Sequence, residues 1–147
     1  MGLFDSLFGG LGGGGTLNAQ EAFAGILLGA SACDGHIADE EVHGLIVALV
    51  RMKLFERVND KQFDQILNKV HKIQKQKGVD ALIDACVPAL PRDLVNAAFA
   101  NACDIVLADG IVEQDEKIFM DKLQLKLGID ANTAKTIVQV MIIKNRG

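Results

Sequence analysis

The fold is decided by a stretch that occurs twice, first as Ala32-Cys33-Asp34-Gly35-His36-Ile37-Ala38-Asp39-Glu40-Glu41 and again as Leu107-Ala108-Asp109-Gly110-Ile111-Val112-Glu113-Gln114-Asp115-Glu116. The copies align at one offset, which pairs Asp34 with Asp109, Gly35 with Gly110, Ile37 with Val112 and Glu41 with Glu116. An apolar, alanine-rich segment precedes each copy, and apolar residues at helical spacing follow it. Each copy therefore predicts a helix, a tight Asp-Gly turn and a second helix.

The rest of the chain also predicts helices and shows no convincing strand pattern. Asn18 and Asn59 are each followed three residues later by Glu or Gln, which is the spacing of a capping box that begins a helix. Further helices are expected over 79–87, from Pro91 to the second turn, and from Asp130 onward. We therefore predict an all-α, single-domain bundle of about seven helices over 17–147, built from two related helix–Asp-Gly-turn–helix halves.

The spacing of apolar residues predicts which helix faces are buried. The predicted buried stripes include Val50 after the first turn, Ile118 after the second turn and Ile142 in the last helix. Gly25 and Gly29 fall on one face of the first helix of the domain. Two glycines at this spacing favour the close approach of a neighbouring helix.

Composition and charge limit the classes of function. The 147 residues fit one domain with one hydrophobic core, since half are hydrophobic and only 5% are aromatic. The formal net charge of −4 argues against a nucleic-acid interface or a polybasic membrane patch, because both need an excess of Lys and Arg. No stretch approaches the roughly 18 apolar residues that span a bilayer, and the N-terminus lacks the pattern of a secretory signal. We therefore expect a cytoplasmic protein.

The three cysteines also favour a cytoplasmic protein. Cys33, Cys86 and Cys103 are odd in number and lie in apolar segments, which favours buried, reduced thiols. Cys33 and His36 could begin a zinc site, but no Cys-x-x-Cys partner follows them. Buried thiols are therefore the preferred interpretation.

Residues 1–16 are predicted to be a separate N-terminal segment. Four large apolar residues fall on one face of a helix: Leu3, Phe4, Leu7 and Phe8. The glycine-rich run 9–15 predicts a flexible tether to the domain. Docking on the domain, disorder, and anchoring to a membrane or a partner all stay open. Because the first 50 residues contain no Lys or Arg, no positive charge assists attraction to a membrane.

Both copies of the repeat have the register of the second half of an EF-hand calcium loop, with Gly at the sixth place and Glu at the twelfth. In a working loop the first and third places carry oxygen ligands. Here those places hold Ala30 and Ala32 in the first copy, and Ile105 and Leu107 in the second. Hydrocarbon cannot coordinate a hard divalent ion, so a normal EF-hand is excluded at both turns.

The acidic residues of the turns have a structural and a functional interpretation. In the structural one, the aspartates accept backbone N–H bonds within the turn, and each glutamate lies near the third position of the next helix, where N–H groups are free. In the functional one, the two turns pack together and their carboxylates need a cation or a basic partner. The candidate ligands of a divalent metal ion are Asp34, Glu41, Asp109 and Glu116, with His36 and His43 as further ligands for a transition metal.

The paired Asp-Gly-x-Ile/Val-x-x-x-Glu motifs in an all-helical chain of this size resemble the TerB family of tellurite resistance proteins. The same module is similar to the N-terminal region of the DjlA-type co-chaperones, and the resemblance covers roughly residues 17–144. It implies a compact bundle of about seven helices in two related halves, a bacterial cytosol, and a role in tellurite and other stress responses. It also implies metal binding by acidic motif residues, and only Asp34, Glu41, Asp109 and Glu116 carry over. The chain departs from the family at Ala38 and Glu113, where a small hydroxyl cap is usual.

We predict a non-enzymatic protein. The sequence has no glycine-rich phosphate loop, no His-Glu-x-x-His motif and no nucleophile elbow. The leading hypothesis is a binding module that joins metal ions or protein partners through its paired acidic turns. The alternative is a membrane-proximal adaptor or co-chaperone-type interaction module that uses the N-terminal segment.

Overall fold

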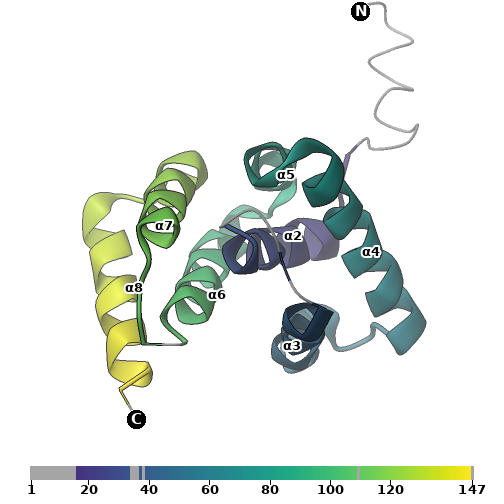
Figure 1. The fold of residues 1–147 in the computed structure, drawn as a ribbon, viewed down its shortest axis with the longest axis horizontal. Coiled ribbons are helices and arrows are strands. Elements are labelled where there is room, and N and C mark those ends of the chain that lie inside the picture. The colour runs from purple at the N-terminus through teal and green to yellow at the C-terminus, as the bar shows by residue number, and fades with distance from the viewer. Residues whose placement is uncertain (1–15, 34–36, 38, 109, 147) are drawn as a thin grey trace, which may run out of the picture.

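The computed structural model describes residues 16–33, 37, 39–108 and 110–146, so the predicted N-terminal segment lies almost wholly outside the described residues. The described residues form seven α-helices and no strand (Figure 1): α2 Ala19–Ser31, α3 Asp39–Val50, α4 Asp60–Lys77, α5 Val79–Cys86, α6 Val95–Leu107, α7 Gln114–Leu127 and α8 Ala131–Lys144. Short 3-10 turns lie at Lys53–Phe55, Val87–Ala89 and Arg92–Leu94. The predicted all-α bundle is confirmed. None of the described helices is both long and apolar enough to cross a membrane.

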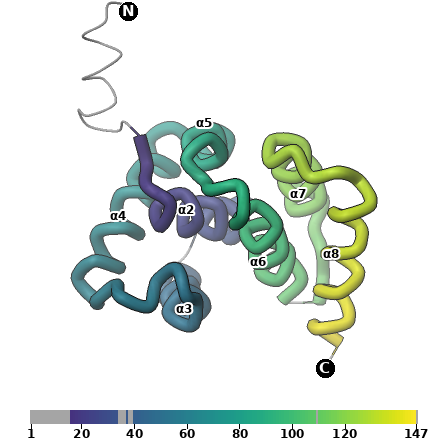
Figure 2. Tube along the Cα trace, turned by 180° about the vertical axis from the view of Figure 1, so that it is seen from behind, coloured from purple at the N-terminus to yellow at the C-terminus, as the bar shows by residue number. Residues whose placement is uncertain are grey.

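The central helix of the bundle is α2. All of its residues from Ala22 to Ala30 are buried, and it packs against α4, α5 and α6 and less extensively against α3 and α7. Figures 1 and 2 show α4 and α5 towards one end of the molecule, and α6, α7 and α8 towards the other. A helix that is apolar on all sides is stable in water only when other elements surround it in this way.

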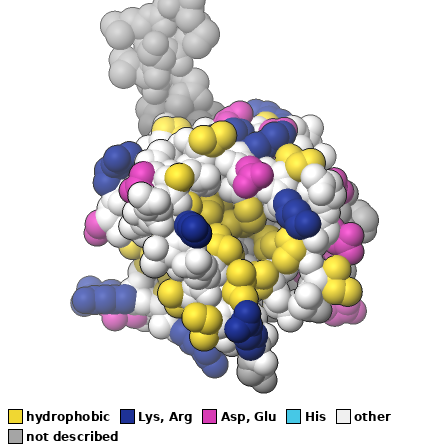
Figure 3. Space-filling view, turned by 90° about the vertical axis from the view of Figure 1, so that its left-hand side faces the viewer, with side chains coloured by type: hydrophobic (Ala, Val, Ile, Leu, Met, Phe, Trp, Pro, Cys, Tyr) yellow, Lys and Arg dark blue, Asp and Glu magenta, His cyan; other side chains and the backbone are white. Residues whose placement is uncertain are grey.

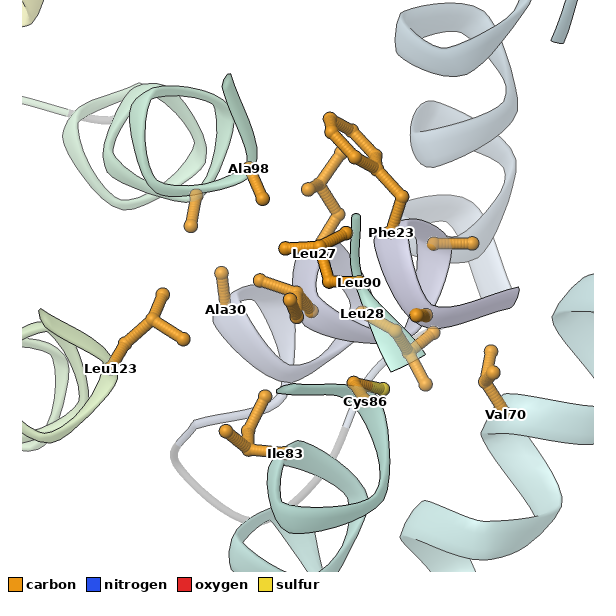
Figure 4. Close-up of a cluster of buried hydrophobic side chains, with 14 of the residues drawn as sticks. Phe23, Leu27, Leu28, Ala30, Val70, Ile83, Cys86, Leu90, Ala98 and Leu123 are labelled. Carbon is orange, nitrogen blue, oxygen red and sulfur yellow. The ribbon is translucent and has the colours of Figure 1, made fainter. Parts of the chain in front are cut away.

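Apolar side chains from several helices meet around α2 (Figure 4). Leu27 and Leu28 of α2 lie among Val70 of α4, Cys86 of α5 and Leu123 of α7 in this cluster. All five side chains are at least 97% buried. This close packing places the main hydrophobic core between α2 and its neighbours.

The two glycines of α2 allow the close approach that the sequence predicts. A Cβ atom at Gly25 would collide with Sγ of Cys86, and one at Gly29 would lie 2.9 Å from Cδ1 of Ile83. Both contacts come from α5. The short helix α5 therefore lies directly on the glycine face of α2.

Local capping decides where several helices begin and end. The side-chain oxygens of Asn18 and Asn59 each accept a hydrogen bond, at 2.8 Å, from the backbone N–H of the residue three positions on. The side chains of those residues, Glu21 and Gln62, accept the backbone N–H of Asn18 and Asn59 in return. Both predicted capping boxes are therefore confirmed. Asp130 caps α8 in the predicted way. Gly78 and Gly128 end α4 and α7 with φ of 90° and 70°, a region that glycine adopts at little cost.

The helices form two groups with similar contacts. In the first group α3 and α4 both pack against α2, and in the second group α7 and α8 both pack against α6. In neither group do the two outer helices make more than marginal contact with each other. Each Asp-Gly motif falls between the first and second helix of its group.

Two details of the sequence prediction are wrong. Pro91 does not begin α6, because its ψ of 143° keeps it extended and the turn Arg92–Leu94 comes between them. Val50, Ile118 and Ile142 are exposed, although their spacing predicts burial. Few helices pack against α3, α7 and α8, so side chains at the edges of their apolar stripes stay in contact with solvent.

Candidate functional site

The first acidic turn is described only in part. Asp34 and His36 lie outside the described residues. Glu41 is exposed and is the third residue of α3, the position predicted for a carboxylate near free N–H groups. Ile37 is half-buried and packs against the core, as expected for the residue beneath the turn.

The second turn shows a capping role for one predicted ligand. Asp109 lies outside the described residues, whereas Gly110 has a positive φ of 80°, a region that glycine adopts at little cost. Glu116 is the third residue of α7, and its Oε1 atom accepts a hydrogen bond from the backbone N–H of Glu113 at 2.8 Å. This carboxylate therefore satisfies a backbone donor at the start of α7.

The described ends of the two turns share one hollow. Cys33, just before the first turn, and Asp115, just after the second, line a hollow of about 350 Å³ together with Lys77 and Lys122. Lys122 also lies 3.5 Å from the carboxylate of Asp80, so both signs of charge are present. Within the described part of the chain, no group of three or more His, Cys, Asp and Glu side chains could hold a metal ion. The hollow thus has neither the acidic lining of a cation site nor the basic lining of an anion site.

A second surface lies between α7 and α8. These helices pack against α6 but contact each other only marginally, although they are joined by the short run 128–130. The side of the molecule that they form is hollowed, and apolar side chains gather in the hollow with both basic and acidic side chains around it (Figure 3). We call this surface, with α7 and α8 as walls and α6 as floor, the α7–α8 groove.

Ion pairs show which side of α7 faces this groove. The Nζ atoms of Lys122 and Lys126 lie 3.5 Å and 2.7 Å from carboxylate oxygens of Asp80 and Asp84 on α5. Because successive residues turn by 100° around a helix, Met120 lies on the opposite side of the buried stripe from these lysines. Met120 is half-buried against the core. It therefore forms the α7 wall of the groove.

The orientation of α8 follows in the same way. Thr133 and Ile137 line a separate hollow with Ala97 of α6, so this edge of α8 is covered by α6. The opposite edge carries Val138, which is half-buried, and Ile142, which is 37% exposed. This edge faces α7. These two side chains form the α8 wall of the groove.

The first group of helices contains a side chain that the second group lacks. Phe55, in the connection between α3 and α4, is 1% exposed, and its ring centroid lies 5.4 Å from that of Phe63 on α4 and 6.3 Å from that of Phe23 on α2. The connection between α7 and α8 contributes only Ile129, at the end where the helices join. Of the residues in α8, only Ala134 is fully buried. No aromatic ring from the described residues is therefore available to fill the gap between α7 and α8.

The cysteines form no candidate site. Burial, with a smaller contribution from the negative charge of Glu21, raises the pKa of Cys86 to about 12. Burial and then the charge of Asp104 raise the pKa of Cys103 to about 11. Both thiols are therefore protonated at neutral pH and are poor nucleophiles and metal ligands. The predicted free, buried thiols are confirmed at these two positions, and Cys33 is half-buried.

The groove does not follow from the predicted helices, although the sequence of α8 contains one signal for it. Six of the seven residues over 137–143 are large and apolar. A helix that packs on one side can bury only about half of such a run. Excess apolar residues in a peripheral helix therefore point to a surface that something else covers.

Comparisons with known protein families, with characterised proteins and with solved structures found no match to this chain.

Proposed function

We propose that this chain is a non-enzymatic binding module whose α7–α8 groove holds an apolar helix of a protein partner. The observation that carries the proposal is the groove itself, an apolar hollow between two helices that lean apart over α6. Amphipathic helices bind in apolar grooves of this kind through anchors at i, i+3 or i+4, and i+7. A third helix between α7 and α8 would complete the packing of both walls.

The exposed apolar surface of α8 supports the proposal. Ile142, on the edge of α8 that faces the groove, is 37% exposed, and half-buried Val138 lies one turn before it. Contiguous apolar surface on a folded protein commonly marks a contact with another molecule. Burying this apolar surface against a partner would stabilise the complex by about 25 cal/mol per Å².

Charge limits the kind of helix that fits. Residues 114–146 carry six Lys or Arg and four Asp or Glu, whereas the first 50 residues carry six Asp or Glu and no Lys or Arg. Residues 114–146 therefore have a net charge of +2 in a protein whose formal net charge is −4. Complementary charge favours a partner helix with acidic or neutral residues beside its apolar face.

The acidic turns form a separate part of the proposal. The bond from Glu116 to the start of α7 and the mixed charges of the shared hollow support a structural role for the parts described. The resemblance to TerB proteins supports the alternative, in which Asp34, Glu41, Asp109 and Glu116 bind a divalent metal ion in a stress response. Membrane attachment through the N-terminal segment is the other alternative.

Methyl NMR tests the groove directly. Full-length protein with labelled Met, Ile and Val methyl groups is titrated with a designed helical peptide that has Leu and Phe at i, i+3, i+4 and i+7 and Glu elsewhere. We expect saturable shifts of the Met120, Val138 and Ile142 signals, and no shift of Val70 or Ile83 in the closed core.

A scrambled peptide of the same composition is the matched control, because it has the same charge and hydrophobicity without an apolar face. It should leave the groove signals in place. Equal shifts with both peptides, or unchanged groove signals at millimolar designed peptide, would contradict the proposal.

A further inference from the structure

The chain itself contains a segment with the properties that the α7–α8 groove requires. Its anchors are Leu3, Phe4, Leu7 and Phe8, whose spacing matches a helix that binds in an apolar groove. The only charged side chain in residues 1–15 is Asp5, an acid, whereas residues 114–146 have a net charge of +2. The segment also carries two phenylalanines, the residue type that closes the equivalent gap in the first group of helices.

The place where the segment joins the domain argues against docking in the same molecule. Leu17 is buried at the start of α2, on the side of α4 and α5. The other end of α2 reaches α7, since a Cβ atom at Gly29 would lie 3.4 Å from the ring of Phe119. The groove therefore lies at least about 20 Å, the length of α2, from Leu17.

The nine chain steps from Phe8 to Leu17 span at most about 32 Å when fully extended, whereas a random coil of this length and glycine content has a root-mean-square span of about 17 Å. Filling the groove of the same molecule would hold this run extended around the surface, at a cost in chain entropy. A second molecule can present its groove close to Leu17 of the first without that cost.

We propose that the N-terminal segment of one copy of this chain docks as a short helix in the α7–α8 groove of a second copy, with Phe4 and Phe8 between the two walls. This inference rests on the proposed function, because it names the partner of the same groove. When two copies exchange their segments the contact closes a dimer, and each groove is then filled.

Sedimentation velocity of the full-length chain is the test. We expect dimers for the wild type at tens of micromolar, and monomers for Phe4→Ser/Phe8→Ser and for the groove variant Ile142→Glu. Loss of two anchor rings should weaken association roughly 100-fold. The matched controls Leu11→Ser and Ile143→Glu change residues in the glycine run and on the outer face of α8, and they should remain dimeric.

Mixing the two monomeric variants gives the sharpest result. One has an intact groove and the other an intact segment, so an equimolar mixture should form a one-to-one dimer. If Ile142→Glu does not fold, a synthetic peptide of residues 1–15 is added to Phe4→Ser/Phe8→Ser, and the Met120 and Val138 methyl signals should shift.

Three outcomes would overturn the inference: a monomeric wild type, a dimer that survives Phe4→Ser/Phe8→Ser, or a mixture that stays monomeric. Binding of the wild type to phosphatidylglycerol vesicles through Phe4 and Phe8, without a change in oligomeric state, would assign the segment to a membrane instead. Groove shifts with the designed peptide but not with residues 1–15 would reject this inference alone. No shift with either peptide would reject the proposed function as well.

Discussion

The two groups of helices differ in what lies between their outer helices. In α2–α3–α4 the connection 51–59 includes Phe55, whose buried ring stacks on Phe63 and meets the edge of Phe23. In α6–α7–α8 the connection 128–130 is too short to bring a side chain back between the helices. Similar contacts of the outer helices with a central helix thus give a closed core in one group and an open groove in the other.

This difference shows that helix order alone does not decide where a helical bundle binds a partner. The length of one connection and a single aromatic side chain decide whether the gap between two helices is filled from within.

The largest effect is expected for Phe55→Ala. Removing a ring that is 1% exposed leaves a cavity beneath α3 and α4 and should lower the free energy of unfolding by about 3–5 kcal/mol. Urea denaturation followed by circular dichroism measures this change. The comparison is Ile142→Ala in the open group, which should cost less than about 1 kcal/mol because the side chain is already partly in water. Equal losses would contradict the distinction between the groups.

A smaller effect is expected for Gly25→Ala in α2. The new methyl group would collide with Sγ of Cys86, so the protein should lose about 1–3 kcal/mol from overpacking, less about 1 kcal/mol gained in helix propensity. A methyl group at Gly29 comes closest to the flexible end of Ile83 and lies at an ordinary contact distance, 3.4 Å, from the ring of Phe119, so Gly29→Ala should stay within about 1 kcal/mol of the wild type. Thermal unfolding ranks the two variants, and the reverse order would show that α5 does not lie on α2 as described.

Glu116 distinguishes a cap from a metal ligand. Glu116→Ala removes the acceptor for the N–H of Glu113 and should cost about 1 kcal/mol, whereas Glu116→Gln keeps an acceptor oxygen and should be nearly neutral. Differential scanning calorimetry gives both values. The same measurement with millimolar calcium, manganese or zinc ions tests the alternative. A rise in melting temperature for the wild type that Glu116→Gln lacks would show metal binding at the acidic turns.

The smallest effect concerns the caps of α4 and α8. Asp130 caps α8, and its hydrogen bonds with the backbone N–H and the hydroxyl of Thr133 lower its carboxyl pKa below the ordinary value of 3.8. A carboxyl with a lowered pKa stabilises the fold above its unfolded-state pKa, and this contribution is lost as the pH falls through the folded value. Asn59, which caps α4, does not titrate.

Stability between pH 7 and pH 3 should therefore depend on Asp130 but not on Asn59. Asp130→Asn should make urea denaturation less sensitive to acid than in the wild type, because an amide caps a helix at either pH. Asn59→Asp should make it more sensitive. An unchanged pH dependence in both variants would mean that neither cap contributes measurably.

The sequence predicts most of this architecture, because the signals that begin and end helices are local. Asn18, Asn59 and Asp130 cap the helices that they are expected to cap, and Gly78 and Gly128 end theirs. The start of α6 was predicted at Pro91, three positions before the intervening turn ends. A proline fixes φ but leaves ψ open, and an extended ψ delays the helix.

The candidate groove could not be predicted in the same way, because it depends on how far apart two helices lie. The spacing of apolar residues in α7 and α8 marks buried stripes but not their edges, so Ile118 and Ile142 were predicted to be inside. The convergence of the acidic turns stays a prediction, since Asp34 and Asp109 lie outside the described residues. Cys33 and Asp115 show only that the turn ends share a surface.

One nuclear Overhauser spectrum of the full-length protein tests most directly whether α2–α3–α4 form a closed core while α6–α7–α8 leave an open groove. With the N-terminal segment inactivated by Phe4→Ser/Phe8→Ser, the ring of Phe55 should give strong cross-peaks to Phe23 and Phe63. The methyl groups of Met120 and Val138 should give none to each other across the open groove. Strong cross-peaks between Met120 and Val138 would mean that α7 and α8 close on themselves, and the binding site proposed between them would not exist.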